Sequence, residues 1–125
     1  MQAYQNTSNN PSAAQRTIAF TINDGLGDSN VISRAIDVKI TPVLSSGSSI
    51  NSYTEKQPAV IIDSTMSIAD VDSTTMSSAK VAITNNFDVN NDVLQFTNQN
   101  GISGTYNSST GILTLSGVAS VSKYV

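Results

Sequence analysis

Acidic residues are the only side chains in this sequence whose spacing suggests chemistry. The chain has 9 Asp and Glu, 6 Lys and Arg, and no His or Cys. Without His and Cys, the chain lacks thiol nucleophiles, the Ser-His-Asp arrangement, the usual zinc ligands and disulfides. No spacing among the carboxylates favours one pair for glycoside hydrolysis. The composition therefore predicts a protein that is not an enzyme.

The best candidate for a metal site combines Glu55 with Asp70 and Asp72. Calcium takes six to eight oxygen ligands, and a carboxylate at a strand start together with an Asp-x-Asp loop can supply several at one end of a β-sandwich. Calcium is expected to bind weakly there, with a Kd on the order of 10⁻⁴–10⁻³ M. The alternative is that Asp70 and Asp72 only cap a turn through their own side chains.

Two further acidic groups are more typical of turns than of binding sites. Asp24 and Asp28 flank a glycine pair that is too short for a phosphate-binding loop. Asp88, Asn90 and Asp92 imitate the start of a calcium loop, but the Gly and the distal Glu of an EF-hand are missing. We therefore expect both groups to serve the local backbone.

Composition indicates a folded, exported β-protein. Hydrophobic residues make up 38% of the chain and charged residues 12%, the net charge is −3, and Val, Ile and Thr are frequent, so the chain should fold. A pI near 4.4 and scattered basic residues argue against nucleic acid as a partner. No apolar run approaches the ~20 residues of a membrane span. The Ser-, Thr- and Asn-rich surface predicts an extracellular or cell-surface location, with any export signal outside this sequence.

The hydrophobic pattern has a period of two throughout, which is typical of half-buried strands. In residues 16–23, Ile18, Phe20 and Ile22 share one face, and a second alternating run follows in residues 32–40, so this region predicts a hairpin or a sheet-crossing strand pair. After a connector at 42–55, further strands are expected at 59–62, at 65–69 with Met66 and Ile68 inward, around Ala79, Val81 and Ile83, and at 93–96. A hairpin of 101–106 with 111–116 follows with Leu113 and Leu115 inward, and 117–125 fits a short helical turn or a frayed strand.

Turn signals recur roughly every 8–12 residues, and no run has helical period. The fold class predicted from this spacing is all-β, an antiparallel β-sandwich of about seven strands.

Several separate blocks resemble bacterial cadherin-like, Ig-like tandem repeats of large secreted adhesins of the RTX or biofilm type. Residues 16–25 (RTIAFTINDG) and 35–43 (AIDVKITPV) resemble the last strands of such a repeat. The opening of the repeat is similar to 53–55 (YTE) and 68–72 (IADVD), and its middle to 92–96 (DVLQF), 99–104 (QNGISG) and 110–117 (TGILTLSG).

The resemblance implies an Ig-like or cadherin-like sandwich that acts as a structural extender or adhesion module of a bacterial cell-surface or secreted protein. It also implies that Glu55, Asp70 and Asp72 correspond to calcium ligands between modules. An Asn-Asp pair that often follows Pro-Val in such linkers is replaced here by Leu44 and Ser45, so one expected ligand is missing.

The blocks stand in permuted order. Residues 1–43 correspond to closing strands, 44–53 to a connector, and 54–125 to opening and middle strands, which together make one β-sandwich unit. The chain either straddles a repeat boundary or is a circular permutant. Neither half should be stable alone, because a two-stranded ribbon is marginal in water and the remainder would carry open strand edges. The halves can complete each other within one chain or by strand exchange between copies or neighbouring repeats, giving a closed dimer or a head-to-tail fibre.

A competing function is that of a carbohydrate-binding module in an exported protein, with surface glycans as partners. Such a site needs two or three aromatic side chains on one flat face. The candidates are dispersed along the chain: Tyr4, Tyr53, Tyr106 and Tyr124. Buried or rim positions for these tyrosines are the alternative.

Overall fold

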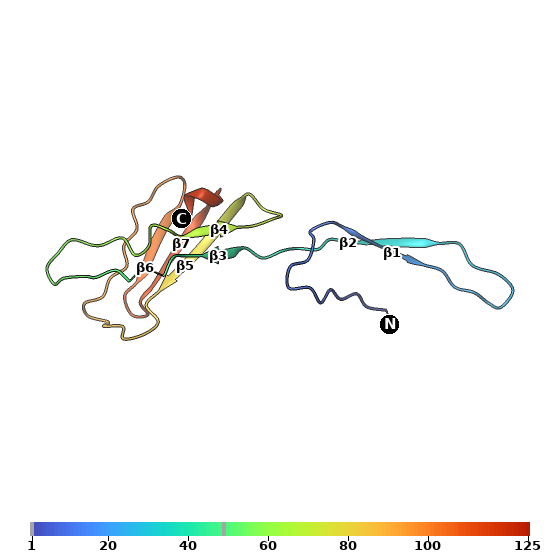
Figure 1. The fold of residues 1–125 in the computed structure, drawn as a ribbon, viewed down its shortest axis with the longest axis horizontal. Helices are drawn as coiled ribbons and strands as arrows, with labels where there is room; N and C mark the ends of the chain where they lie inside the picture. Colours follow the sequence, from blue (N-terminus) through green and yellow to red (C-terminus); the bar gives the residue numbers. More distant parts are fainter. Residues whose placement is uncertain (1, 49) are drawn as a thin grey trace. The chain divides into compact units, whose positions relative to one another are not determined.

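The computed structural model describes residues 2–48 and 50–125, and the regular structure in these ranges is β apart from one short 3₁₀ helix (Figure 1). The elements are β1 (Arg16–Phe20), β2 (Ile32–Ile36), β3 (Val43–Ser45), β4 (Ser67–Ala69), β5 (Thr75–Ala82), β6 (Ser103–Asn107), β7 (Ile112–Ser120) and the 3₁₀ helix η1 (Val121–Lys123). All strand pairs are antiparallel. The predicted all-β antiparallel fold of about seven strands is therefore confirmed, with the strands divided among three small sheets. Within the described ranges, no helix has the length and apolar character needed to cross a membrane.

The chain divides into two compact units, Met1–Thr41 and Pro42–Val125. The first unit is built on the predicted hairpin, in which β1 pairs with β2 from Arg16↔Ile36 to Phe20↔Ile32. Ile18 and Phe20 are half-buried while the residues between them are exposed, as the period of two requires. Ile22 departs from the prediction, because it lies beyond the end of β1 and is 77% exposed.

The second unit contains a three-stranded sheet with β7 in the centre, between β5 and β6. Leu113 lies opposite Val81 and Tyr106, and Leu115 lies opposite Ala79 and Gly104, so these residues form cross-strand rows on one face. Leu113 and Leu115 are 5% and 6% exposed. The predicted hairpin around residues 107–111 and the inward positions of both leucines are therefore confirmed.

An extended segment, residues 92–97, covers this face without belonging to a strand. Its side chains alternate, with Leu94 and Phe96 half-buried against the core and Gln95 exposed. Phe96 lies directly over Gly104, since a Cβ built on that glycine would come within 3.0 Å of the phenylalanine side chain. Ile102, 2% exposed, completes the buried core. The three-stranded sheet is thus one layer, and this segment contributes to a second.

Several expected elements differ from the structure. Residues 59–62 and 93–96 were predicted as strands, but neither stretch pairs in a ladder with any described residue. A strand that the sequence did not predict, β3, forms at the start of the expected connector and pairs with β4. The prediction for residues 65–69 is met by β4, in which Ile68 faces inward. Beyond residue 117, β7 runs on to Ser120 and is followed by η1.

A β-bulge in β7 requires glycine. Gly117 and Val118 of β7 stand opposite the single residue Ser77 of β5, where the register shifts. Gly117 has φ +137°, and a Cβ at this position would collide with the backbone carbonyl of Gly101. The chain therefore passes close to another backbone here in a conformation that side chains of L-residues disfavour.

Replacing this glycine should weaken the second unit sharply. Gly117→Ala is expected to lower the free energy of unfolding by about 2–4 kcal/mol, because the new methyl group adds backbone strain and a clash with Gly101. Urea unfolding followed by circular dichroism measures the loss. Ser116→Ala, at the exposed neighbouring position, is the control and should change the unfolding free energy by less than about 0.5 kcal/mol. Equal effects of the two substitutions would contradict this role for Gly117.

Candidate functional site

The three predicted metal ligands lie in two separate turns. Asp70 follows β4 and accepts a hydrogen bond from the backbone N–H of Asp72 at 3.2 Å, which closes a local turn. Glu55 lies in another turn beside Lys56, with 4.0 Å between the Lys56 Nζ and the Glu55 Oε1, and both side chains are exposed. Residues 2–48 and 50–125 contain no group of three or more acidic, His or Cys side chains placed to hold a metal ion. As arranged here, the three carboxylates do not form a calcium site, and calcium binding by them stays a prediction.

The Asp24 carboxylate holds the turn that follows β1. It accepts hydrogen bonds from the backbone N–H groups of Leu26 at 2.9 Å and Gly27 at 3.2 Å. These bonds favour the ionised carboxylate and lower the pKa of Asp24. The side-chain amide of Asn23 donates to Asp28 at 2.7 Å and ties the two sides of the turn. The carboxylate oxygens of both acids thus accept hydrogen bonds from the backbone and side chains of the same turn.

The run from Asp88 to Asp92 is also a self-capped turn. The Asp88 carboxylate accepts from the side-chain amide of Asn91 at 2.8 Å and from the backbone N–H of Asn90 at 3.0 Å. The Asn91 side chain and then the Asn90 N–H lower the pKa of Asp88. The backbone N–H of Asp88 in turn donates to the Asp92 carboxylate at 2.9 Å. The turn fixes the start of the extended segment 92–97.

The tyrosines do not gather on one exposed face. Tyr106 packs against the core and donates its hydroxyl to the backbone carbonyl of Asp92 at 2.7 Å. Tyr124 packs there as well and donates to the carbonyl of Gly117. Tyr53 is 62% exposed and donates to the carbonyl of Gln57 at 3.2 Å, and Tyr4 is 39% exposed in the other unit. Two of the four tyrosine rings, those of Tyr106 and Tyr124, therefore pack against the core.

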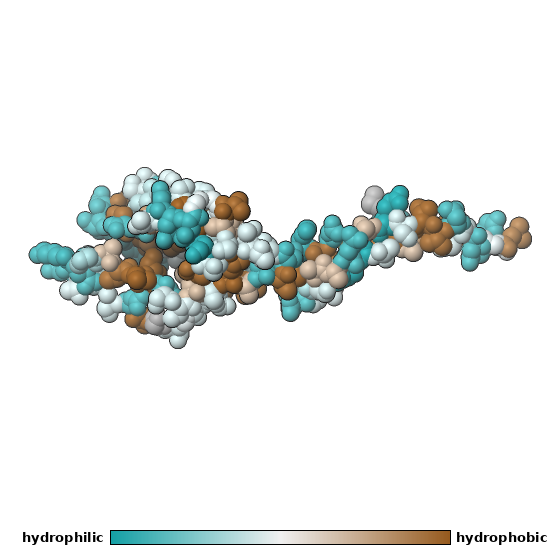
Figure 2. Space-filling view, turned by 90° about the horizontal axis from the view of Figure 1, so that it is seen from above, coloured by the Kyte–Doolittle hydropathy of each residue, from teal (hydrophilic) through white to brown (hydrophobic). Residues whose placement is uncertain are grey.

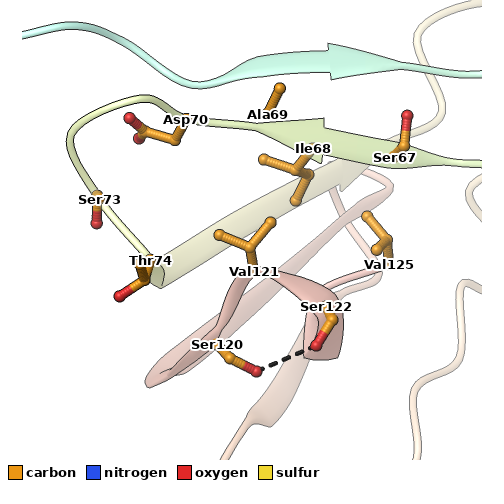
Figure 3. A pocket seen from close by; sticks show the side chains of 10 residues that line it. All are labelled: Ser67, Ile68, Ala69, Asp70, Ser73, Thr74, Ser120, Val121, Ser122 and Val125. Carbon is orange, nitrogen blue, oxygen red and sulfur yellow. Dashed lines mark hydrogen bonds between the residues drawn. The ribbon is translucent and has the colours of Figure 1, made fainter.

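A shallow groove of about 570 Å³ lies in the second unit (Figure 3). It is lined by Ser67, Ile68, Ala69, Asp70, Ser73, Thr74, Ser120, Val121, Ser122 and Val125. Ile68 and Val121 point toward one another across it, and the N–H of Val121 donates to the carbonyl of Thr74 at 3.1 Å, which fastens η1 to the start of β5. The groove offers hydroxyl groups and one carboxylate, that of Asp70, which accepts the backbone N–H of Asp72.

Large apolar side chains are exposed in both units. Figure 2 shows apolar atoms at the surface in both units. In the second unit they include Val93, 60% exposed, beside the half-buried Leu94. Sequence reasoning identified the alternation of residues 93–96 but did not foresee that the segment would lack a strand partner.

The Asp88 turn gives a pH prediction. Because the folded pKa of Asp88 is lowered, its contribution to the turn is fully present above the ordinary carboxyl pKa and is lost as the pH falls through the lowered value. Asp88→Ala should remove these hydrogen bonds at neutral pH, as protonation of the carboxylate weakens them at acidic pH. We therefore expect faster amide hydrogen exchange at Asn90 and Asn91. NMR carboxyl titration and hydrogen exchange measure both effects. If Asp88 titrates at or above the ordinary Asp value, the turn does not depend on its charge.

Comparison with known proteins shows a similarity to part of a much longer protein. Over 109 residues, 83% of the chain, the sequence is 31% identical to Halomucin of Haloquadratum walsbyi (strain DSM 16790 / HBSQ001). The matched part is 1% of that protein, so the chain spans a very small fraction of its relative. No protein-family model and no solved structure matches the chain, so membership of the cadherin-like or Ig-like repeats is not established. What these comparisons support is similarity to a short segment of a very large protein.

Proposed function

We propose that this chain is a non-enzymatic structural module of a cell-surface or secreted protein. The observation that carries the proposal is the match of 109 residues to 1% of Halomucin, because a stretch of one or two modules within a very long chain has this size. The two compact β units support it, since long surface proteins are assembled from small units in series. Extracellular location is part of the proposal and rests on the same similarity.

The mechanism proposed for the module is mechanical. Antiparallel ladders hold each unit together, and a series of such units in a long chain would keep a binding tip at a distance from the cell. The polar surface is dominated by uncharged Ser, Thr and Asn, and charged residues make up only 12% of the chain. The stability of a module with such a surface should depend little on salt concentration, because few surface ion pairs contribute to it.

Strand exchange between copies or neighbouring repeats extends this proposal. The first unit has a two-stranded sheet, and a ribbon of this kind is marginal by itself. The second unit has only three buried apolar side chains among its described residues. The first unit thus lacks further strands to pair with, and the second unit lacks apolar strands to cover its core. Each unit could supply what the other lacks. Exchange would join copies into closed dimers or head-to-tail fibres, and neighbouring repeats would be the partners in a longer chain.

The mass in solution tests strand exchange. We expect the mass to rise with concentration above the 13.1 kDa of one chain, because association completes both units. Sedimentation velocity over a hundred-fold concentration range measures it. A compact species of 13.1 kDa at every concentration would contradict exchange between copies.

Calcium at Glu55, Asp70 and Asp72 remains a separate proposal that requires Glu55 to approach the loop that follows β4. Millimolar calcium should then raise the melting temperature relative to a chelator, because a ligand that binds only the folded state stabilises it. The gain should disappear in Asp70→Asn and persist in Asp28→Asn, which changes an acid in the other unit. Identical melting curves with calcium and with chelator would exclude a structural calcium site.

Binding of surface glycans is the competing function, and the exposed ring of Tyr53 is the observation that favours testing it. For a purely structural module we expect no saturable binding on a glycan array or in calorimetry. Tyr53→Ala removes the exposed ring, while Tyr106→Phe removes only a hydroxyl bonded to the Asp92 carbonyl and serves as the control. Saturable binding that is lost in Tyr53→Ala and retained in Tyr106→Phe would overturn the structural reading.

A further inference from the structure

Acceptor motifs for N-linked glycans occur at two places in the chain. The motif is Asn-x-Ser or Asn-x-Thr with x other than Pro, and it begins at Asn6 (Asn-Thr-Ser) and at Asn107 (Asn-Ser-Ser). In a secreted protein this motif marks a surface loop that can carry an oligosaccharide. Both asparagines are exposed. The structure around each motif shows how its amide group is presented.

Asn107 is the last residue of β6, where the hairpin turns toward β7. Its backbone carbonyl accepts hydrogen bonds from the N–H groups of Gly111 at 2.9 Å and Thr110 at 3.2 Å. Gly111 has φ +66°, and a Cβ built on it would come within 3.0 Å of the Phe87 ring, so that ring lies against the turn. These contacts fix the turn, while residues 107–110 are all exposed. The motif therefore lies on an ordered turn at the surface.

The Asn107 side chain is on the face of β6 that points away from the core. Burial alternates along this strand, with Gly104 and Tyr106 half-buried and Ser103, Thr105 and Asn107 exposed. Since Tyr106 packs against the core, the side chain of the next residue points to the opposite side of the sheet. A sugar attached to Asn107 would therefore extend into solvent without displacing a core side chain.

The amide group of Asn107 is oriented through its oxygen atom. The Oδ1 accepts the backbone N–H of Ser109 at 2.9 Å, which forms an Asx turn. Among the described residues, none accepts a hydrogen bond from the Asn107 Nδ2. In Asn23 and Asn91, by contrast, Nδ2 donates to a nearby carboxylate at 2.7 Å and 2.8 Å. The nitrogen atom to which a glycan is attached is thus available at Asn107.

The hydroxyl group at the third position distinguishes the two motifs. At Asn6 the same Asx turn forms, because the Ser8 N–H donates to the Asn6 Oδ1 at 2.9 Å. The Ser8 Oγ, however, also accepts the backbone N–H of Asn10 at 3.1 Å. Within the described ranges, the Ser109 Oγ has no hydrogen-bond partner. Since the motif requires this hydroxyl, the one that follows Asn107 is the more available for recognition.

From these observations we infer that Asn107 is an acceptor site for an N-linked oligosaccharide, with a lipid-linked oligosaccharide as the donor. The Nδ2 of Asn107 forms a bond to C1 of the first sugar, and one amide proton passes to a base of the transferase. The bond between C1 and the lipid phosphate breaks, and its electron pair leaves with the phosphate. A glycan here adds bulk and hydration to a surface with few charges, since charged residues make up 12% of the chain. The inference rests on the proposed surface or secreted location, because this transfer acts on exported chains.

Translation of the full chain into microsomes tests the site. The microsomes supply an oligosaccharyltransferase and its lipid-linked donor, an added signal exports the chain, and Asn6→Gln leaves a single motif. We expect a shift in gel mobility that a glycosidase reverses, with Asn107 identified as the modified residue by peptide mass spectrometry.

Substitution of the hydroxyl residues supplies the matched controls. Ser109→Ala should lower the modified fraction by about five-fold or more, although it keeps the backbone N–H that closes the Asx turn. Ser108→Ala changes the middle position, which the motif leaves open, and should keep the modification. Equal modification of the two variants would contradict recognition of this motif.

Two further results would overturn the inference. One is an unmodified Asn107 when a chain with Asn107→Gln is modified at Asn6, because export and transferase are then both active. The other is no transfer to either motif when a reporter glycoprotein is modified in the same microsomes. Since the export signal is supplied, both results leave the proposed location standing. Failure of that location would instead appear as recovery of the chain without the added signal only from inside its own cells.

Discussion

Coverage of one sheet face is the constraint on which the second unit depends. The rows formed by Val81, Leu113 and Tyr106 and by Ala79, Leu115 and Gly104 must be removed from water for the sheet to persist. Burial of one large aliphatic side chain contributes roughly 1.5–3 kcal/mol, and only Ile102, Leu113 and Leu115 are nearly fully buried among the described residues. Since conformational entropy opposes folding at every residue, so small a core makes each covering side chain important. Incomplete coverage of the sheet by the second layer therefore lowers the stability of the unit.

Local pattern predicted the elements whose partners are close in sequence. The hairpin of β1 and β2 and that of β6 and β7 follow from alternation around turn residues, and Leu113 and Leu115 were placed correctly for the same reason. Residues 93–96 show the same alternation, but a ladder also needs a neighbour, and pattern does not reveal a partner far away in sequence. The short strand β3 was missed because Val43-Leu44-Ser45 has no period and follows a proline.

The candidate metal site shows the same limit. Asp-x-Asp spacing is enough to predict that Asp70 accepts from the backbone N–H of Asp72, because both atoms belong to one turn. The position of Glu55 relative to that turn depends on the long loop between β3 and β4, and its sequence does not specify the path. Asp24, Asp63 and Asp88 illustrate a general use of acids in this chain: hydrogen bonds from neighbouring residues lower the pKa of each carboxyl. The ionised forms of these three carboxyls stabilise the turns in which they lie.

Open edges are usually a hazard, because an unpaired strand with exposed apolar residues invites aggregation. Native proteins protect edges with inward charges, prolines or bulges, whereas the bulge at Gly117 lies in β7, the central strand of its sheet. The segment 92–97 has no proline or bulge, and its only charge is Asp92, whose backbone carbonyl is already bonded to Tyr106. Arg34 interrupts the apolar face of β2 but leaves β1 uninterrupted between Arg16 and Phe20. Among the described strands, β1 therefore keeps one edge without a partner and residues 93–97 stay outside any ladder, so these two stretches are where association through open backbone groups is expected first.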